Sequence, residues 1–266
     1  MNKSVFSLST WALLSVYLVI LAGAVVRMTG SGMGCPDWPK CFGYLIPPTE
    51  RSQLDWQPNK NYEKGNVIIL DNSLQVATQT FESGKTIDLQ NWESYTKHDY
   101  TTFNATHTWV EFINRLLGAI SGLIVLGLFI RSLWGIRKQP SLSLFSFFAV
   151  VGMGVQAWLG KTVVDSNLLP SKISLHMIMA LLIVSILLFV RAKSHGKQIQ
   201  QPSKSLLILI VGSFVLTLIQ FGLGVDDASL SITKSNKQDL ILLSFGSIVP
   251  KSLFTFTVPC HSLLWC

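Results

Sequence analysis

Long apolar stretches without charge dominate the chain. Residues 5–26 carry no charged side chain over 22 positions, and residues 206–225 carry none over 20. About 20 apolar residues cross the hydrocarbon core of a bilayer as a helix. The pattern therefore predicts five membrane-spanning helices, at residues 6–26, 109–130, 142–160, 173–190 and 206–225. A weaker sixth candidate, near residues 240–265, is interrupted by Lys251 and by two prolines, which kink helices.

The composition agrees with a membrane protein of the all-α class. Only 13% of the residues are Asp, Glu, Lys or Arg, against about 25% in a soluble domain. This low share excludes a disordered, a nucleic-acid-binding and an ordinary soluble protein. We predict a polytopic helical bundle in contact with membrane lipid. The net charge of +7 is attributed to orientation in the membrane and not to a nucleic-acid partner.

Positive residues are unevenly shared between the short loops. They gather after the second and fourth predicted helices, at Arg131, Arg137, Lys138, Arg191, Lys193, Lys197 and Lys204. Short cytoplasmic loops carry such an excess. We therefore predict a cytoplasmic N-terminus, an outer loop over residues 27–108 and a bacterial-type inner membrane. The apolar core of the first segment is too long for a cleaved signal peptide, so we expect a retained helix.

The outer loop, residues 27–108, is a candidate lid or small cap, with a possible amphipathic helix over residues 72–80. Three glycines near its start allow tight turns or close approach to a ligand. Cys35 and Cys41 follow on the predicted oxidising side. They could form a structural staple or a reversible redox pair, and a metal site is less favoured.

Two histidines lie near the outer ends of predicted helices. His107, Glu111 and Asn114 form one polar stripe on the second helix, because they are four and seven residues apart. His176 lies three residues into the fourth helix, and we expect it at a similar depth to His107. The two imidazoles could ligate one haem iron, or they could be interfacial histidines bonded to headgroups, water or carbonyls. Arg115 could pair with a haem propionate or with Glu111.

Five segments together resemble the haem A synthase family of cytochrome oxidase assembly. They are residues 25–41, the Ile-Pro-Pro at 46–48, the Glu-Phe-Ile-Asn-Arg-Leu-Leu-Gly at 111–118, residues 156–170 and the helix with His176. The resemblance covers about residues 5–225. It implies two four-helix bundles related by an internal repeat, of which this chain holds the first over residues 1–195.

The resemblance also implies a reaction and its groups. Family members oxidise the C8 methyl of haem O to a formyl group, with oxygen from water or dioxygen. One bundle handles the haem O substrate and the other holds a haem B cofactor, with histidine pairs as axial ligands. Glu111 matches the glutamate important for the reaction, His176 matches a substrate-side histidine, and Cys35 and Cys41 match the outer-loop cysteine pair. Haem O synthase and oxidase assembly factors are the implied partners.

The chain departs from the family pattern in two places. Asn114 stands where a histidine is expected, and asparagine is a poor ligand of haem iron. His107, on the same stripe, is then the candidate to replace it. The last forty residues do not resemble the family, so we expect residues 205–266 to form a partial second bundle, through truncation or a frameshift.

Three functions are compatible with these residues. The first is a haem A synthase-like oxidoreductase with Glu111 as catalytic residue, His107 and His176 as iron ligands, and Arg115 at the haem. The second is a non-catalytic haem-binding or oxidase-assembly protein. The third, a membrane thiol oxidoreductase working through Cys35 and Cys41, ranks last, because the cysteines lack the Cys-x-x-Cys spacing of such enzymes.

Overall fold

A computed structural model describes residues 3–96 and 103–195, together with Ile208, Gly212 and Leu216. The chain divides into two compact units, Met1–Pro202 and Ser203–Cys266, and the first is described here. The fifth and sixth predicted helices therefore lie outside the described residues, apart from the three named positions. His98, Cys260, His261 and Cys266 also lie outside. The predicted division at residues 195 and 205 stays a prediction.

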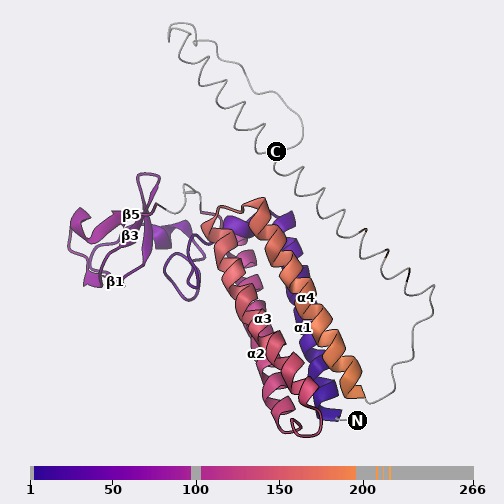
Figure 1. Cartoon of the computed structure of the whole chain (residues 1–266). Coiled ribbons are helices and arrows are strands. Elements are labelled where there is room, and N and C mark those ends of the chain that lie inside the picture. Colours follow the sequence, from indigo (N-terminus) through magenta and orange to yellow (C-terminus); the bar gives the residue numbers. More distant parts are fainter. Residues whose placement is uncertain (1–2, 97–102, 196–207, 209–211, 213–215, 217–266) are drawn as a thin grey trace, which may run out of the picture. The chain divides into compact units, whose positions relative to one another are not determined.

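Four long helices form the body of the first unit (Figure 1). They are α1 (Lys3–Met28), α2 (Ala105–Leu133), α3 (Pro140–Asp165) and α4 (Pro170–His195). Each is long and apolar enough to cross a membrane, which confirms the first four predicted spans. Proline at the first position suits the starts of α3 and α4, because that position needs no amide donor. The chain is an integral membrane protein.

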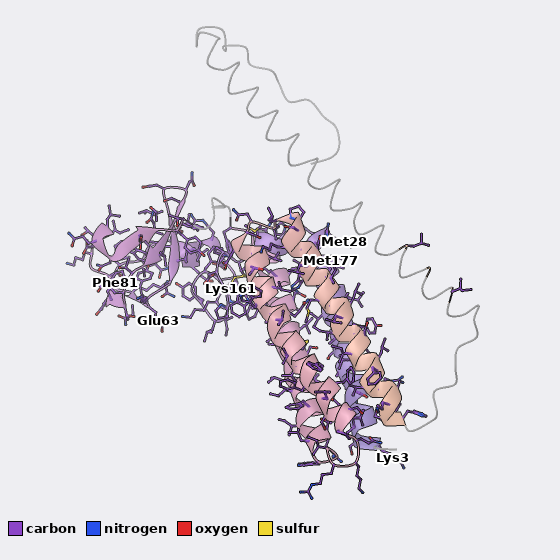
Figure 2. All side chains as sticks on the ribbon, in the orientation of Figure 1. Lys3, Met28, Glu63, Phe81, Lys161 and Met177 are labelled. Carbon is purple, nitrogen blue, oxygen red and sulfur yellow. A yellow bond between two sulfur atoms is a disulfide. The ribbon has the colours of Figure 1, made fainter. Side chains whose placement is uncertain are left out.

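The helices pack as an antiparallel ring in which α1 touches α2 and α4, and α3 touches the same two. Lys3 lies at one end of the bundle, and Met28 and Met177 lie at the other, beside the folded loop (Figure 2). We call the half that contains Met28 and the start of α2 the cap half. The half that contains Lys3 and the end of α2 is the base half.

The apolar core of the bundle lies in the base half. All four helices contribute to it: Val5, Ala12, Leu13, Val16, Val125, Leu128, Leu142, Ala149, Ile183, Val184, Leu187 and Val190. In the cap half the described helices hold few buried residues. There is none over residues 17–28, 112–120, 153–158 or 170–182. The two halves of one bundle are therefore packed in different ways.

The outer loop folds into a small β-rich cap, which follows the short helix η1 (Ser31–Met33). Its elements are η2 (Arg51–Leu54), β1 (Asn61–Tyr62), β2 (Val67–Leu70), β3 (Ser73–Ala77), β4 (Phe81–Glu82), η3 (Leu89–Asn91) and β5 (Trp92–Ser94). The strands pair antiparallel, in the orders β1-β4 and β2-β3-β5. The predicted cap is confirmed.

The helix predicted over residues 72–80 is wrong, because this segment contains β3. Asp71 and Asn72 both have positive φ, 47° and 57°, as a tight hairpin turn requires. The turn pairs Leu70 with Ser73 and Val67 with Val76. The β-branched residues of β2 then pack into the core of the cap.

Candidate functional site

A closed ring of residues 35–41 begins the cap. Cys35 and Cys41 form a disulfide, and their residues are 0% and 1% exposed. The Asp37 carboxylate accepts hydrogen bonds from the amides of the two residues that follow the ring, Phe42 at 2.5 Å and Gly43 at 2.8 Å. The pairing expected from the family resemblance is therefore present, and its burial suits a structural staple.

The disulfide ring lies directly on the first turns of α2. A methyl group placed on Gly34 would come within 2.5 Å of the carbonyl oxygen of His107, so only glycine allows this approach. The Thr108 hydroxyl donates to the Gly34 carbonyl at 2.8 Å. The Cys35 Sγ lies 3.8 Å from the Thr108 carbonyl oxygen. Backbone contact thus fixes the ring against the helix.

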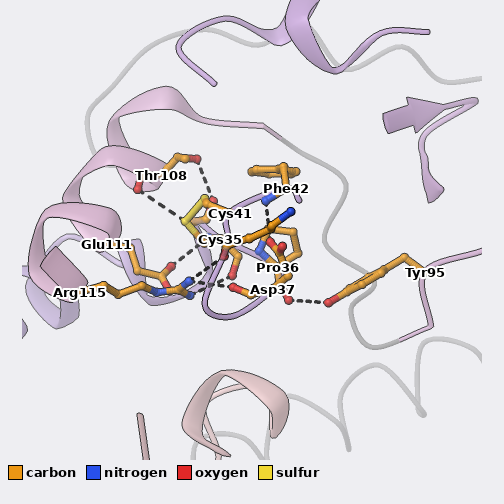
Figure 3. A network of polar contacts seen from close by, with 11 residues as sticks. Cys35, Pro36, Asp37, Cys41, Phe42, Tyr95, Thr108, Glu111 and Arg115 are labelled. Carbon is orange, nitrogen blue, oxygen red and sulfur yellow. Dashed lines mark hydrogen bonds and ion pairs between the residues drawn. A yellow bond between two sulfur atoms is a disulfide. The ribbon is translucent and has the colours of Figure 1, made fainter. Parts of the chain in front are cut away.

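Glu111 and Arg115 of α2 form an ion pair that the ring covers (Figure 3). Glu111 is 4% exposed, and its Oε2 accepts a hydrogen bond from the Cys35 amide at 2.9 Å. Arg115 Nη1 donates to the carbonyls of Asp37 at 2.7 Å and Lys40 at 3.1 Å. Of the two roles considered for Arg115, pairing with Glu111 is the one that the structure shows.

Burial changes the acidity of two groups around the ring. It raises the pKa of the Asp37 carboxyl above its ordinary value, although the Gly43 and Phe42 amides and the Arg115 charge work in the opposite direction. It also raises the pKa of Tyr95 to about 12. The Tyr95 hydroxyl donates to the Pro36 carbonyl at 2.7 Å, so the end of the cap returns to the ring.

Contacts between helices define one level in the cap half. A methyl group on Gly23 of α1 would lie 3.9 Å from Asn114 Oδ1 of α2, and one on Gly160 of α3 would lie 3.4 Å from His176 Cε1 of α4. Gly122 of α2 lies beside Met153 of α3. Eight residues further toward the cap, α2 reaches Asn114 and α3 reaches the residue after Gly160. Gly23, Asn114, Gly160 and His176 therefore share one level, which we call the histidine level.

Several buried polar atoms at or near this level have no partner. They are His176 Nδ1, Asn114 Oδ1, Gln156 Oε1 and Trp109 Nε1. A buried polar group without a partner is uncommon in a native protein and calls for an explanation such as a bound molecule. One imidazole nitrogen, two amide oxygens that accept and one indole N–H that donates would suit a flat ligand with a metal and polar substituents. Of the described residues, no three His, Cys, Asp or Glu cluster to hold a bare metal ion.

His107 lies away from the histidine level. It precedes Asn114 by seven positions on α2, about 10 Å further outward at 1.5 Å per residue. The expectation that His107 and His176 lie at a similar depth is therefore not met. The backbone amide of His107 donates to the Asn104 side chain at 3.2 Å, and its carbonyl lies under Gly34.

Sequence reasoning missed three parts of the site. The roles of Asp37, Thr108 and Tyr95 depend on how the loop returns to α2. Asp37 alone had a usable signal, because an aspartate in a stretch rich in glycine and proline often accepts bonds from nearby backbone amides. Asn114 stood out in the sequence, but the unpaired state of Asn114 and Gln156 is visible only in the packed bundle.

These features define a class of protein. It is an integral membrane four-helix bundle in which one half is packed with apolar side chains and the other carries a half-buried imidazole beneath a disulfide-bonded cap. The chain belongs to the cytochrome oxidase assembly protein family, which it matches over residues 7–82 and 75–230.

Individual relatives agree with this assignment. The chain is 26% identical to the haem A synthase of Shewanella oneidensis over 215 residues, covering 78% of this chain and 53% of the relative. It is 26% identical to that of Rickettsia prowazekii over 236 residues, covering 84% and 62%. A shorter match to the Bacillus licheniformis haem A synthase is 35% identical over 72 residues, 26% of this chain and 24% of the relative. No solved structure matches.

The chain thus spans a little over half the length of the first two of these relatives.

Proposed function

We propose that this chain is the substrate-side bundle of a haem A synthase-like oxidoreductase, which converts the C8 methyl of haem O to the formyl of haem A for cytochrome oxidase. The single observation that carries the proposal is the histidine level, where His176 lies among unpaired buried polar atoms. The family and the names of the relatives supply the substrate class.

The residues divide the work in the following way. His176 would bind the haem iron. On opposite sides of the histidine level, the Gln156 carbonyl would accept a hydrogen bond from the substrate and the Trp109 indole would donate one. Glu111 lies one turn outward from Asn114 on α2, and its carboxylate can accept a proton released near the reacting methyl. Arg115 and the Cys35 amide hold both carboxylate oxygens in place. His107, which the sequence offered as an iron ligand, is assigned to the helix start beneath the cap.

The stoichiometry of the proposed oxidation determines which reactants the site needs. With water as the oxygen source, a methyl group and one water give a formyl group with the release of four protons and four electrons, so the reaction requires an external electron acceptor. A haem B cofactor, when bound, supplies electron transfer. The part of the family fold that would hold it corresponds to residues 205–266, nearly all of which lie outside the described residues, so no step is assigned to it.

We also propose the orientation predicted from the loops. The base half would face the cytoplasm, and the cap would lie outside an inner membrane of bacterial type. Lys3, Arg131 and Arg191 at base-half helix ends support this orientation. An outer cap also suits a stable disulfide. Haem O synthase and oxidase assembly factors are the proposed partners.

The test is co-expression with a source of haem O, followed by purification, an absorption spectrum and chromatography of the extracted pigment. The wild type should yield haem A, and the Glu111→Gln variant should retain haem O without converting it. A Soret band with haem O alone in both proteins would contradict the enzyme and support the non-catalytic reading. A folded protein without pigment would contradict both.

A non-catalytic haem-binding or assembly role is the second candidate. It is favoured by Asn114, which stands where the family pattern has a histidine ligand. The thiol oxidoreductase is disfavoured by the burial of Cys35 and Cys41, because a thiol partner must reach a sulfur atom. Thiol titration of the folded protein with and without reductant separates this third candidate from the others.

A further inference from the structure

We infer that a haem in this bundle has His176 as its one axial ligand from the described residues, while the amide of Asn114 faces the opposite axial position and leaves it open. The inference rests on the proposed function, since it requires haem to bind. It concerns how this chain would hold the iron where Asn114 departs from the histidine pair that the family resemblance implies.

The first step is the level at which the two side chains lie. Asn114 and His176 belong to α2 and α4, which are diagonal in the ring of helices. The contacts with Gly23 and Gly160 place them at one level. Diagonal helices face each other across the center of a bundle, where side chains from facing helices build cofactor sites. The two residues are therefore suited to opposite faces of one flat ligand.

The second step is the direction in which each side chain packs. Asn114 Oδ1 lies next to Gly23 of α1, and the His176 ring lies next to Gly160 of α3. The α1/α2 pair thus carries the amide, and the α3/α4 pair carries the imidazole. Between these pairs the cap half holds no fully buried side chain over residues 112–120 or 170–182. A planar ligand between the helix pairs would fill the space that apolar side chains fill in the base half.

The third step is the chemistry of the two groups. Imidazole is a common axial ligand of haem iron, and a side-chain amide is not among the usual ones. The carbonyl oxygen of Asn114 is a hydrogen-bond acceptor that is buried without a donor. It would accept a hydrogen bond from a small molecule with an O–H or N–H group at the open axial position.

Other described residues do not supply a second ligand at this level. His107 lies about 10 Å further outward along α2, and His195 ends α4 at the base. The sulfur of Met177 contacts Arg27 Nη1 at 3.8 Å. Met153 and Met179 pack against Gly122 and Gly152, deeper in the bundle.

The experiment uses the full chain in detergent, loaded with haem. The readouts are the spin state, from absorption and electron paramagnetic resonance, and the binding of carbon monoxide to the ferrous form. The wild type should be high-spin and should bind carbon monoxide. Asn114→His should become low-spin and lose carbon monoxide binding, because a second imidazole takes the open position.

Two matched histidine variants serve as controls. His107→Ala should keep the wild-type spectrum, since this residue lies away from the histidine level, whereas His176→Ala should lose the haem. If Asn114→His does not fold, Asn114→Leu takes its place. Asn114→Leu should keep carbon monoxide binding but lose affinity for a hydrogen-bond donor such as hydrazoic acid.

Three results would overturn the inference. A haem-loaded wild type that is low-spin and does not bind carbon monoxide would show a second strong ligand and would leave the proposed function standing. A change of spin state in His107→Ala would identify that ligand as His107. A wild type that binds no haem would defeat the proposed function and this inference together.

Discussion

The base half and the cap half of the bundle are built from the same four helices but are stabilised differently. In the base half, apolar side chains from every helix interlock and exclude solvent. In the cap half, the most buried side chains of α2 are polar, namely Thr108 and Glu111. Thr108 bonds to Gly34, next to the disulfide ring, and Glu111 bonds to the ring itself. Among the described helices, the base half leaves one buried polar atom without a partner, Ser146 Oγ, whereas the cap half leaves four that a ligand could satisfy.

The difference shows how one bundle can be stable in one half and able to bind a ligand in the other. Close packing in the base half fixes the helix register, so the cap half does not need its own apolar core to hold the helices in place. The disulfide ring then fixes α2 at the point where packing is weakest. The predictions below test this division, from the largest expected effect to the smallest.

Removing Glu111 should have the largest effect on stability. Glu111→Ala leaves Arg115, whose side chain is 15% exposed, as an unpaired charge, which costs about 3–5 kcal/mol. The matched control is Asp55→Ala, which breaks an exposed pair with Arg51 at the same spacing and should cost about 1 kcal/mol or less. Unfolding in detergent measures both. Equal losses of unfolding free energy in the two variants would mean that the disulfide ring does not shield the Glu111–Arg115 ion pair from solvent.

Truncating one leucine in each half of α4 should separate the two kinds of packing. Leu187→Ala opens a cavity in the base half, where this residue is 0% exposed, and should cost about 2–5 kcal/mol. Leu175→Ala lies in the cap half at 49% exposure and should change the stability by about 0.5 kcal/mol or less. The free energy of unfolding is the measurement. A large loss at Leu175 would reveal a second apolar core.

Opening the disulfide ring should have an intermediate effect. The double variant Cys35→Ser with Cys41→Ser frees a short ring, and chain entropy predicts a loss of about 2 kcal/mol. The wild type should resist mild reductant while folded, because both sulfurs are buried, and reductant should leave the double variant unchanged. Rapid reduction of the folded wild type would contradict the buried, structural disulfide.

The pH dependence at Asp37 should be the smallest effect. Burial raises its folded pKa above the ordinary 3.8, so the folded state holds the proton more tightly than the unfolded state. The contribution of Asp37 to the free energy of unfolding is therefore fully present below pH 3.8. It declines as the pH rises through the folded pKa, by up to about 1.4 kcal/mol per pH unit. The stability of the wild type relative to Asp37→Asn should fall over this range. If the stability of the wild type relative to Asp37→Asn rose with pH instead, the folded pKa of Asp37 would be lowered and the prediction would be wrong.

The sequence predicted the four described spans because an uninterrupted apolar run has one stable arrangement in a bilayer. The sequence also predicted a cap over the outer loop. The pairing of Cys35 with Cys41 came from the family resemblance. It did not predict the strands, although Val67–Leu70 followed by Asp71 and Asn72 is a recognisable hairpin signal. Alternation is weak in this stretch because three successive residues of β2 are buried.

The arrangement of the site could not be predicted from spacing alone. Periodicity correctly placed His107, Glu111 and Asn114 on one stripe, but it gave no register between α2 and α4. That register follows through α3, from the contact of Gly122 with Met153 and that of Gly160 with His176. The backbone carbonyls that bind Arg115 likewise depend on how the disulfide ring folds, since every residue has a carbonyl and only the fold determines its direction.

The return of the cap to its own starting point has an evolutionary consequence. The Cys41 and Tyr44 backbones bond to each other where the cap begins, and Tyr95, near its end, bonds back to Pro36. A segment whose two ends are held together can change length at low cost, because each doubling of a closed loop costs only about 0.6 kcal/mol. The intervening strands are thus a replaceable module, in which insertions and deletions can accumulate while Glu111 and Arg115 stay covered.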